Sequence, residues 1–210
     1  MSIYNKNNLA IAGACSADSV RPEISGVLFK KDRTVATDSY MMIEVVNPAE
    51  MLASESEYPA IPNEKHFVNF PKSGLIIPAV SVNKVKKNLA EVKNQILPIL
   101  QNCVFLSPRT AGISLIASTD LEKTDIVSVK SIDGQYPNYN RILQNIKGAN
   151  ISVSLDIAKL KQIIDILSTM NLLLDGRIKI TVNEKNEPFV IKAETKENQQ
   201  ITAVIMPLRS

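Results

Sequence analysis

The sequence has few of the residues on which catalytic and metal sites usually depend. Its 210 residues include one histidine, His66, two cysteines and no tryptophan. Cys15 and Cys103 each stand alone in an apolar setting, so we interpret them as buried, reduced thiols rather than as a disulfide or metal ligands. A single histidine leaves little material for a Ser-His-Asp triad or a histidine-rich metal site.

Glycine and long apolar runs are also scarce. None of the seven glycines stands in a G-x-G-x-x-G or Walker A pattern, which excludes the common phosphate-binding loops. No window is apolar enough to span a bilayer, and the opening MSIYNKNN lacks the apolar stretch of a signal peptide. We therefore expect a soluble, cytoplasmic protein with no membrane partner and no cofactor.

The composition is that of an ordinary globular protein. Hydrophobic residues make up 45% of the chain and charged residues 21%, and the chain is long enough to bury a core without disulfides. The net charge of +3 permits a nucleic-acid partner but does not require one. Clustering of the basic residues on one surface is the better indicator of nucleic-acid binding.

Strand-like segments dominate the sequence. They are rich in β-branched residues, alternate to varying degrees, and are separated by turn residues such as Asp175-Gly176. This pattern predicts antiparallel strands at 26–29, 33–37, 40–46, 102–107, 112–118, 125–132, 177–182, 188–194 and 201–207.

Three helices are expected between the strands. The first is short, at about 8–17. The second follows Pro78 and has one apolar stripe, formed by Val82, Val85, Leu89, Val92 and Ile96. The third has a similar stripe, with Ser154 as its expected N-cap, formed by Ile157, Leu160, Ile164 and Leu167.

Helices and strands alternate as a weak internal repeat of roughly 60–80 residues. We interpret each repeat as one helix packed on one small antiparallel sheet, which makes the fold class α+β. Residues 47–75 are the most loop-like segment and connect the first two repeats. Residues 144–150 are the expected linker before the third repeat.

Lysines gather on the second and third predicted helices. A face of this kind can simply be solvated. It can also be a phosphate-binding surface without sequence preference, and the low aromatic content favours duplex backbone over stacked single strands. The candidate DNA-binding residues are Lys84, Lys86, Lys87, Lys93, Lys159 and Lys161.

One pair of carboxylates is compatible with metal chemistry. Asp120 and Glu122 form a D-x-E pattern, and two carboxylates on one strand face can hold a divalent ion, as in a metal-dependent nuclease. The neighbouring Ser118-Thr119 and Lys123-Thr124 indicate an exposed turn instead. We therefore expect no catalytic residues and no metal site.

Three stretches together resemble a known family. They are RPEISGVLFKKDRTVATDSYMMIEV (21–45), GLIIPAVSVNKVKKNL (74–89) with SIDGQYPNYNRIL (131–143), and ITAVIMPLRS (201–210). In this order they are similar to the bacterial DNA polymerase III beta subunit, the sliding clamp. The resemblance implies a DNA clamp fold, with a clamp-type domain at 1–145 and a half-domain at 150–210.

The resemblance also implies a peptide-binding groove. In the family, a terminal Met-Pro segment and a strand turn line a hydrophobic groove that receives peptides of polymerases, the clamp loader and repair proteins. Without the resemblance, the methionines would be interpreted as core residues. The implied groove residues are Thr37, Ser39, Tyr40, Met41, Met42, Leu143, Val204, Met206, Pro207, Leu208 and Arg209.

The function implied is that of a DNA-replication processivity factor. Such a protein is not an enzyme; it holds duplex DNA without sequence specificity, tethers a polymerase or clamp-loader peptide, and works as a homo-oligomer. Two alternatives stay open: an adaptor that binds clamp-binding peptides without encircling DNA, and a metal nuclease using Asp120 and Glu122.

This chain departs from the family pattern in several places. Ser39 stands where the family usually has Gly, Tyr40-Met41 replaces a more polar pair, Gln144 replaces Pro, and the last residue, Ser210, is not apolar. The chain corresponds to three half-domains, whereas the family chain has six and closes a ring as a dimer. Four copies would supply as many helices as that ring contains.

Overall fold

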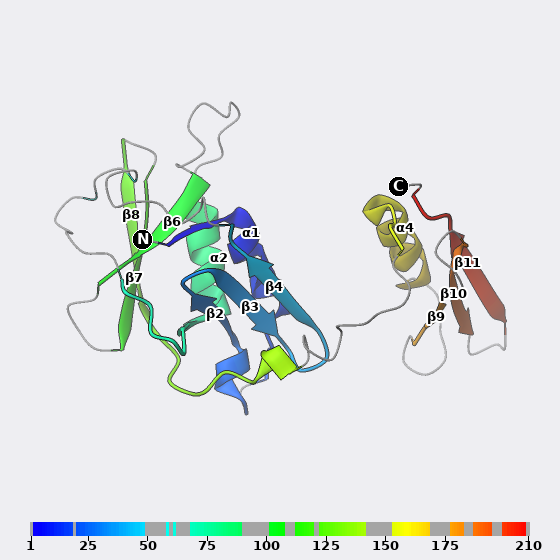
Figure 1. Cartoon of the computed structure of the whole chain (residues 1–210), viewed down its shortest axis with the longest axis horizontal. Coiled ribbons are helices and arrows are strands. Elements are labelled where there is room, and N and C mark those ends of the chain that lie inside the picture. Colours follow the sequence, from blue (N-terminus) through cyan, green and yellow to red (C-terminus); the bar gives the residue numbers. More distant parts are fainter. Residues whose placement is uncertain are drawn as a thin grey trace. The chain divides into compact units, whose positions relative to one another are not determined.

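The computed structural model describes residues 2–18, 20–48, 58, 61, 68–89, 101–107, 112–119, 122–141, 153–168, 177–182, 187–194 and 199–208. The chain forms two compact units, residues 1–137 (unit 1) and 138–210 (unit 2), drawn in Figure 1. Each unit is described by itself.

Unit 1 contains two four-stranded antiparallel sheets, and its helix α2 (Ala79–Asn88) contacts strands of both. One sheet has the order β4-β3-β2-β5, with β2 Gly26–Lys30, β3 Arg33–Thr37, β4 Met42–Val46 and β5 Leu75–Pro78. The other has the order β1-β6-β7-β8, with β1 Ile3–Asn5, β6 Asn102–Leu106, β7 Ile113–Thr119 and β8 Thr124–Lys130.

The two halves of unit 1 exchange their opening strands. β1, at the start of the first repeat, pairs with β6 of the second repeat. β5, at the start of the second repeat, pairs with β2 of the first. The expectation of one helix on its own separate sheet is therefore wrong in this respect, because each sheet takes a strand from the other repeat. The exchange joins the halves through backbone hydrogen bonds as well as through side-chain packing.

The first helical segment of unit 1 begins and ends earlier than the sequence predicts. α1 spans Lys6–Ala10 and continues as the 3₁₀ helix η1, Ile11–Ala14, so the first helical segment ends earlier than residue 17. Asn5 caps α1 by accepting hydrogen bonds from the backbone N–H groups of Asn7 and Asn8. α2 begins directly after Pro78, as expected, and Val92 and Ile96 lie outside the described residues.

Aromatic side chains form the centre of the unit 1 core. Tyr4, Phe29 and Phe105 are fully buried, and their ring centroids lie 5.0–5.6 Å apart in edge-on or tilted pairs. Each of the three residues comes from a different strand, β1, β2 or β6. The core therefore depends on both sheets and on the strand exchange.

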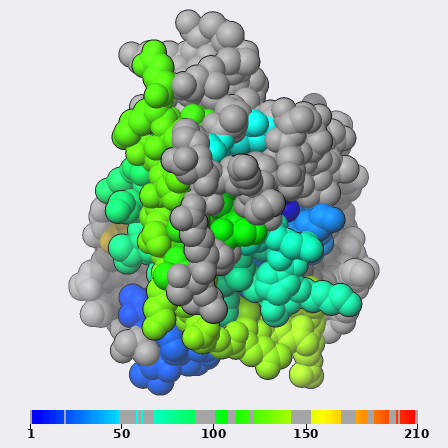
Figure 2. Space-filling view, turned by 90° about the vertical axis from the view of Figure 1, so that its left-hand side faces the viewer, coloured from blue at the N-terminus to red at the C-terminus, as the bar shows by residue number. Residues whose placement is uncertain are grey.

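The segment that follows β8 lies along unit 1. Ile132 donates its backbone N–H to the Ile76 carbonyl at 2.9 Å. The Tyr136 hydroxyl donates to the Val35 carbonyl at 3.3 Å. Gly134 has a φ of 151°, a backbone conformation that only glycine adopts readily. Figure 2 shows this yellow-green segment running on from β8 along the lower edge of that face.

Unit 2 is a third copy of the repeat. Helix α4 (Ile157–Ser168) packs on a sheet of order β11-β10-β9, with β9 Lys179–Thr181, β10 Phe189–Glu194 and β11 Gln200–Ile205. Asp156, not Ser154, is the N-cap: its carboxylate accepts from the N–H groups of Ala158 and Lys159. The Ser154 prediction is wrong because Ser154 lies two residues before the cap, where its carbonyl accepts from Leu208 N–H.

All nine predicted strands are present, with ends shifted by up to two residues. Two further strands, β1 and β5, have three and four residues and were not predicted. Both are opening strands that pair with the other half of unit 1. The alternation that marks a strand in a sequence needs more residues than these contain.

Candidate functional site

The turn between β3 and β4 presents part of the predicted groove. The Asp38 carboxylate accepts hydrogen bonds from the N–H groups of Tyr40 and Met41, at 2.8 and 2.7 Å. The Thr37 hydroxyl donates to the Met41 carbonyl at 2.7 Å. Residues 37–41, the hairpin tip, are therefore held by their own side chains, which is typical of an Asx turn.

Two features of the hairpin tip follow from this geometry. The N–H groups of Met41 and Tyr40 lower the pKa of the Asp38 carboxyl by stabilising its charged form. Ser39 has a φ of 83°, in the left-handed region that glycine tolerates without strain. Glycine is therefore the residue that this backbone conformation favours at position 39.

Apolar side chains are exposed at the hairpin tip. Tyr40 is 97% exposed, and Met41 and the nearby Ile43 are also exposed, whereas Thr37 and Met42 are half-buried. Met41 is therefore not a core residue of unit 1. Ile43 was not among the predicted groove residues, and its place in the alternating pattern of β4 does not reveal that it is exposed.

A second exposed apolar row lies on the terminal segment of unit 2. Along β11 and the residues after it, Val204, Met206 and Leu208 point outward, whereas Ile205 between them is buried. Met206 is 66% exposed. Outward-facing strand positions are normally polar, so three consecutive apolar ones are unusual. We call these three residues the terminal strip.

The terminal strip has an attachment of its own. Leu208 donates its N–H to the Ser154 carbonyl at 2.8 Å, which holds the chain beside the residues that precede α4. Pro207, next to it, is half-buried. The predicted groove residues Leu143 and Arg209 lie outside the described residues. The hairpin tip and the terminal strip belong to different units, so each is a surface of its own unit.

Two of the three lysines of α2 are exposed. Lys84 and Lys87 are exposed and Lys86 is half-buried, while Val82 and Val85 face the core. Among the residues that the structure describes, no carboxylate forms an ion pair with any of these three lysines. Their charges are available to an external anion. Lys93 lies outside the described residues.

The two lysines of α4 differ from each other. Lys159 and Lys161 are both exposed. Lys161 forms an ion pair with Asp165 one helical turn further on, which is a common arrangement on a helix surface. The positive charge of Lys161 is thus partly compensated, and Lys159 is the better candidate for binding a phosphate.

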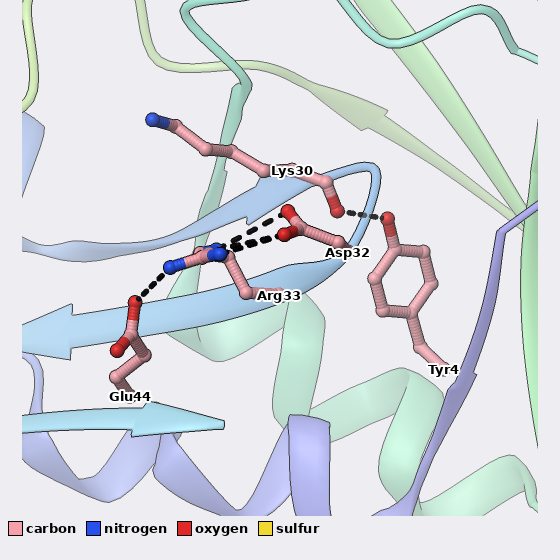
Figure 3. A network of polar contacts seen from close by, with 5 residues as sticks. All are labelled: Tyr4, Lys30, Asp32, Arg33 and Glu44. Carbon is pink, nitrogen blue, oxygen red and sulfur yellow. Dashed lines mark hydrogen bonds and ion pairs between the residues drawn. The ribbon is translucent and has the colours of Figure 1, made fainter. Parts of the chain in front are cut away.

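An ionic network supports the hairpin that carries the tip (Figure 3). The Arg33 guanidinium donates to Asp32 at 2.7 Å and to Glu44 on β4 at 2.9 Å. The hydrogen bonds that Arg33 donates to Asp32 lower the pKa of the Asp32 carboxyl. The Tyr4 hydroxyl donates to the Lys30 carbonyl at 2.6 Å, and burial raises the pKa of this phenol. The contacts of Arg33 link β3 to β4 and to the turn after β2, so these charged groups stabilise the hairpin.

The D-x-E pattern lies between β7 and β8. Glu122 is exposed there, and Asp120 lies outside the described residues. Lys123 forms an ion pair with Asp125 at 2.9 Å, so the nearest described carboxylate already has a partner. No group of three potential metal ligands occurs among the residues that the structure describes.

The two cysteines are free thiols in different surroundings. Cys103 is fully buried, and this burial raises its pKa to about 12. Cys15 is only half-buried, which corrects the expectation that both are buried, and desolvation raises its pKa to about 11. Neither thiol has the lowered pKa of a reactive cysteine.

In the described part of the chain, no helix is long and apolar enough to cross a membrane.

Comparison with solved structures identifies the fold. The DNA polymerase sliding clamp from Pseudomonas aeruginosa matches with a TM-score of 0.63 at 16% identity, over 98% of this chain and 50% of that one. The C. crescentus beta sliding clamp gives 0.61 at 16% identity with the same coverage. The sliding clamp from Bacillus subtilis gives 0.57 at 15% identity, over 98% and 48%. No protein-family model and no curated protein matches the sequence.

The chain therefore has the fold of a bacterial DNA sliding clamp, which confirms the predicted α+β clamp fold and the resemblance at the level of the fold. It spans about half the length of the solved clamps that it matches.

Proposed function

We propose that this chain acts as a clamp-like processivity factor in DNA replication. It holds duplex DNA through the phosphate backbone and tethers a polymerase or a clamp-loader peptide through a hydrophobic groove. It works in the cytoplasm as a homo-oligomer, and it catalyses no reaction of its own. The proposal also keeps the predicted division into a clamp-type domain at 1–145 and a half-domain at 150–210.

One observation carries the proposal. Apolar side chains are exposed at both places that the clamp resemblance assigns to peptide binding, the hairpin tip and the terminal strip. An exposed methionine or tyrosine offers an adaptable apolar surface to a partner, and such surfaces are uncommon unless something binds them. Met41 and Met206 supply this surface in units 1 and 2, respectively.

The DNA part of the proposal depends on Lys84 and Lys87, which are exposed on α2 and lack a described ion-pair partner. Binding of a duplex through phosphates weakens as salt is added, because bound counterions are released. Replacing both lysines with glutamate should weaken binding to a duplex of any sequence. It should also lower the slope of log K against log salt by about 1 per lysine.

The control for this change is charge reversal elsewhere on unit 1. Lys31 and Lys72 are exposed and lie in loops, so Lys31→Glu with Lys72→Glu alters the net charge equally. Binding is measured by fluorescence anisotropy over a salt series, and retention by gel filtration on a nicked circular duplex. Equal losses in the two double variants would mean that only net charge matters, and would remove the assignment to α2.

The peptide part is tested with Met206→Ala. A synthetic peptide carrying a bacterial polymerase clamp-binding motif should bind this variant about 1–3 kcal/mol more weakly, the range for truncating a buried anchor of an interface. Ile126→Ala, which truncates an exposed side chain on β8, is the matched control. Calorimetric titration that finds no difference between the two variants would contradict the groove assignment.

A clamp-like adaptor without topological DNA binding is the second candidate. It needs only the apolar side chains that are exposed at the hairpin tip and the terminal strip, and no closed ring. Retention on circular DNA that disappears after linearisation supports the processivity factor. Peptide binding without such retention supports the adaptor.

A further inference from the structure

The three repeats open in the same way. In unit 1, β1 runs into the α1 cap Asn5, and β5 ends at the α2 cap Pro78. In unit 2, residues 153–155 run into the α4 cap Asp156. A short segment, which is a strand in both repeats of unit 1, a cap residue and a helix therefore follow one another in each repeat.

A shared hydrogen bond supports this equivalence. In each repeat, the carbonyl two residues before the cap accepts a hydrogen bond from the segment that follows the last strand of the same repeat. Ile3 accepts from the Asn47 side chain at 3.1 Å, Ile76 from Ile132 N–H at 2.9 Å, and Ser154 from Leu208 N–H at 2.8 Å. Residues 153–155 thus occupy the position of an opening strand.

The opening segment of unit 2 differs in one respect. β1 and β5 each pair with the first sheet strand of another repeat, β6 and β2. Within the described ranges, residues 153–155 pair with no strand, and β9 pairs only with β10. The described part of unit 2 therefore has an opening segment without a partner strand and an open sheet edge at β9, whereas the corresponding parts of unit 1 are paired with each other.

The helix of unit 2 is also less covered than its counterpart. Counted from the cap, Val82 and Val85 of α2 correspond to Leu160 and Ile163 of α4. The two valines are at most 1% exposed, whereas Leu160 and Ile163 are half-buried. Ile157, which is 82% exposed, corresponds to Ala79, which packs against the unit 1 core. Ile164 and Ile166 are exposed as well.

The core of unit 2 is correspondingly thin. Among the described residues, its cluster has three buried members, Leu167, Ile191 and Ala193. The surface of α4 carries a shallow depression lined by Ala158, Lys161, Gln162, Asp165 and Ile166. A unit with so small a core needs a further layer to bury its apolar helix face.

We propose that a second copy of this chain supplies this layer. Residues 153–155 of each copy pair with β9 of the other, and the two α4 helices pack together as a complete clamp-type domain. In unit 1, each repeat covers the other. These two repeats have already exchanged their opening strands, β1 and β5, with each other. In the described part of the chain, the third repeat combines an opening segment without a partner strand and an open sheet edge at β9. Two copies related by a two-fold axis therefore supply each other's missing strand partner.

The register follows from unit 1. There the cap residue lies opposite the first residue of the partner strand, as in the Asn5–Asn102 and Pro78–Gly26 pairs. The same rule sets Asp156 opposite Lys179 and Leu155 opposite Ile180 of the other copy. The first pair joins opposite charges and the second is apolar, both favourable as cross-strand neighbours. This interface is independent of DNA and of peptide binding.

The first test is the solution mass of the full chain by sedimentation equilibrium, without DNA or peptide. We expect a mass of two chains, each of 23.1 kDa, that falls to one on dilution. Ile157→Glu should raise the dimer dissociation constant on the order of 100-fold, because it buries an unpaired carboxylate. An acidic residue in the first turn is favourable for a helix, so α4 itself should persist.

Val80→Glu is the matched control. Val80 also lies in the first turn of its helix and is also 82% exposed, but it lies on α2 of unit 1. This variant should dimerise as the parent does. A parent mass of one chain up to about 100 µM, where an interface even of micromolar affinity would form, overturns the proposal. So do equal dimer affinities for the parent and Ile157→Glu.

Hydrogen exchange on the same samples tests the strand pairing. The amides of residues 153–155 and of β9 should exchange slowly in the dimer, and should lose protection on dilution or in Ile157→Glu. Circular dichroism of the variant shows whether unit 2 stays folded. A dimer in which these amides exchange at a rate independent of concentration overturns the reciprocal strand pairing.

Discussion

Replacing Gly26 with alanine tests the strand exchange on which unit 1 depends. Gly26 begins β2 and lies opposite Pro78 of β5. A Cβ atom at this position would lie 2.7 Å from the Ile77 carbonyl oxygen, 2.8 Å from Ile76 Cγ2 and 2.9 Å from Ile132 Cδ1. Real Cβ contacts are longer, and the carbonyl belongs to backbone that the sheet holds in place. The two strands must therefore move apart.

The expected loss in the free energy of unfolding is about 1–3 kcal/mol, the range for an extra methyl group in a packed interior. A gain of about 0.4–1 kcal/mol from the less flexible unfolded chain opposes it only in part. For a unit of this size the midpoint of thermal unfolding should fall by roughly 3–5 °C per kcal/mol lost.

Tyrosine signals provide the assay. Four of the five tyrosines lie in residues 1–137 and the chain has no tryptophan, so near-ultraviolet circular dichroism mainly reports unit 1. Gly13→Ala is the control, because a Cβ there meets nothing within 4 Å. It should be neutral or slightly stabilising. If Gly26→Ala unfolds at the same denaturant concentration as Gly13→Ala, the close approach of β2 and β5 is refuted.

Two further predictions concern the hairpin tip. Ser39→Gly should raise the free energy of unfolding by about 0.5–1 kcal/mol, because relief of the left-handed strain exceeds the entropy that glycine adds to the unfolded chain; an unchanged or lower value in urea denaturation would contradict this. The pKa of Asp38 is lowered from 3.8 in the folded state, so its contribution to stability is complete above that pH and is lost as the pH falls below it. Asp38→Asn, which keeps an acceptor oxygen, should therefore flatten the fall in stability below about pH 4. Equal slopes for the two proteins would show that this carboxylate is not involved.

Local patterns in the sequence were enough to predict most of the elements. Nine strands, the start of α2 after Pro78 and the length of α4 follow from alternation, apolar stripes and turn residues, which are properties of neighbouring residues. The clamp fold came from short motifs in a fixed order. The cap of α4 was missed because Ser154 and Asp156 are both good caps, and only the hydrogen bonds distinguish them.

The candidate site could be predicted only as a set of residues. From their residue type, Met41 and Met206 would be interpreted as core residues, whereas the resemblance implies that they line a groove. In the structure both are exposed, so neither is a core residue. That exposure depends on which strand face the sheet turns outward, which the residue type does not determine. The exposure of Ile43 on β4 was missed for the same reason. Ile157 was predicted as part of the apolar stripe of the third helix, and its 82% exposure corrects that prediction.

The sequence by itself determined the repeat of helix and strands, the absence of the usual catalytic motifs, and the positions of the lysines and terminal apolar residues. Only the tertiary structure decided that β1 and β5 change sheets, because pairing partners far along the chain create strands too short to have a pattern. It also decided that Val85 is buried while Ile163, at the same helical position, is half-buried. Whether a residue is buried depends on which part of the protein packs over it. In unit 1, the other repeat packs over Val85.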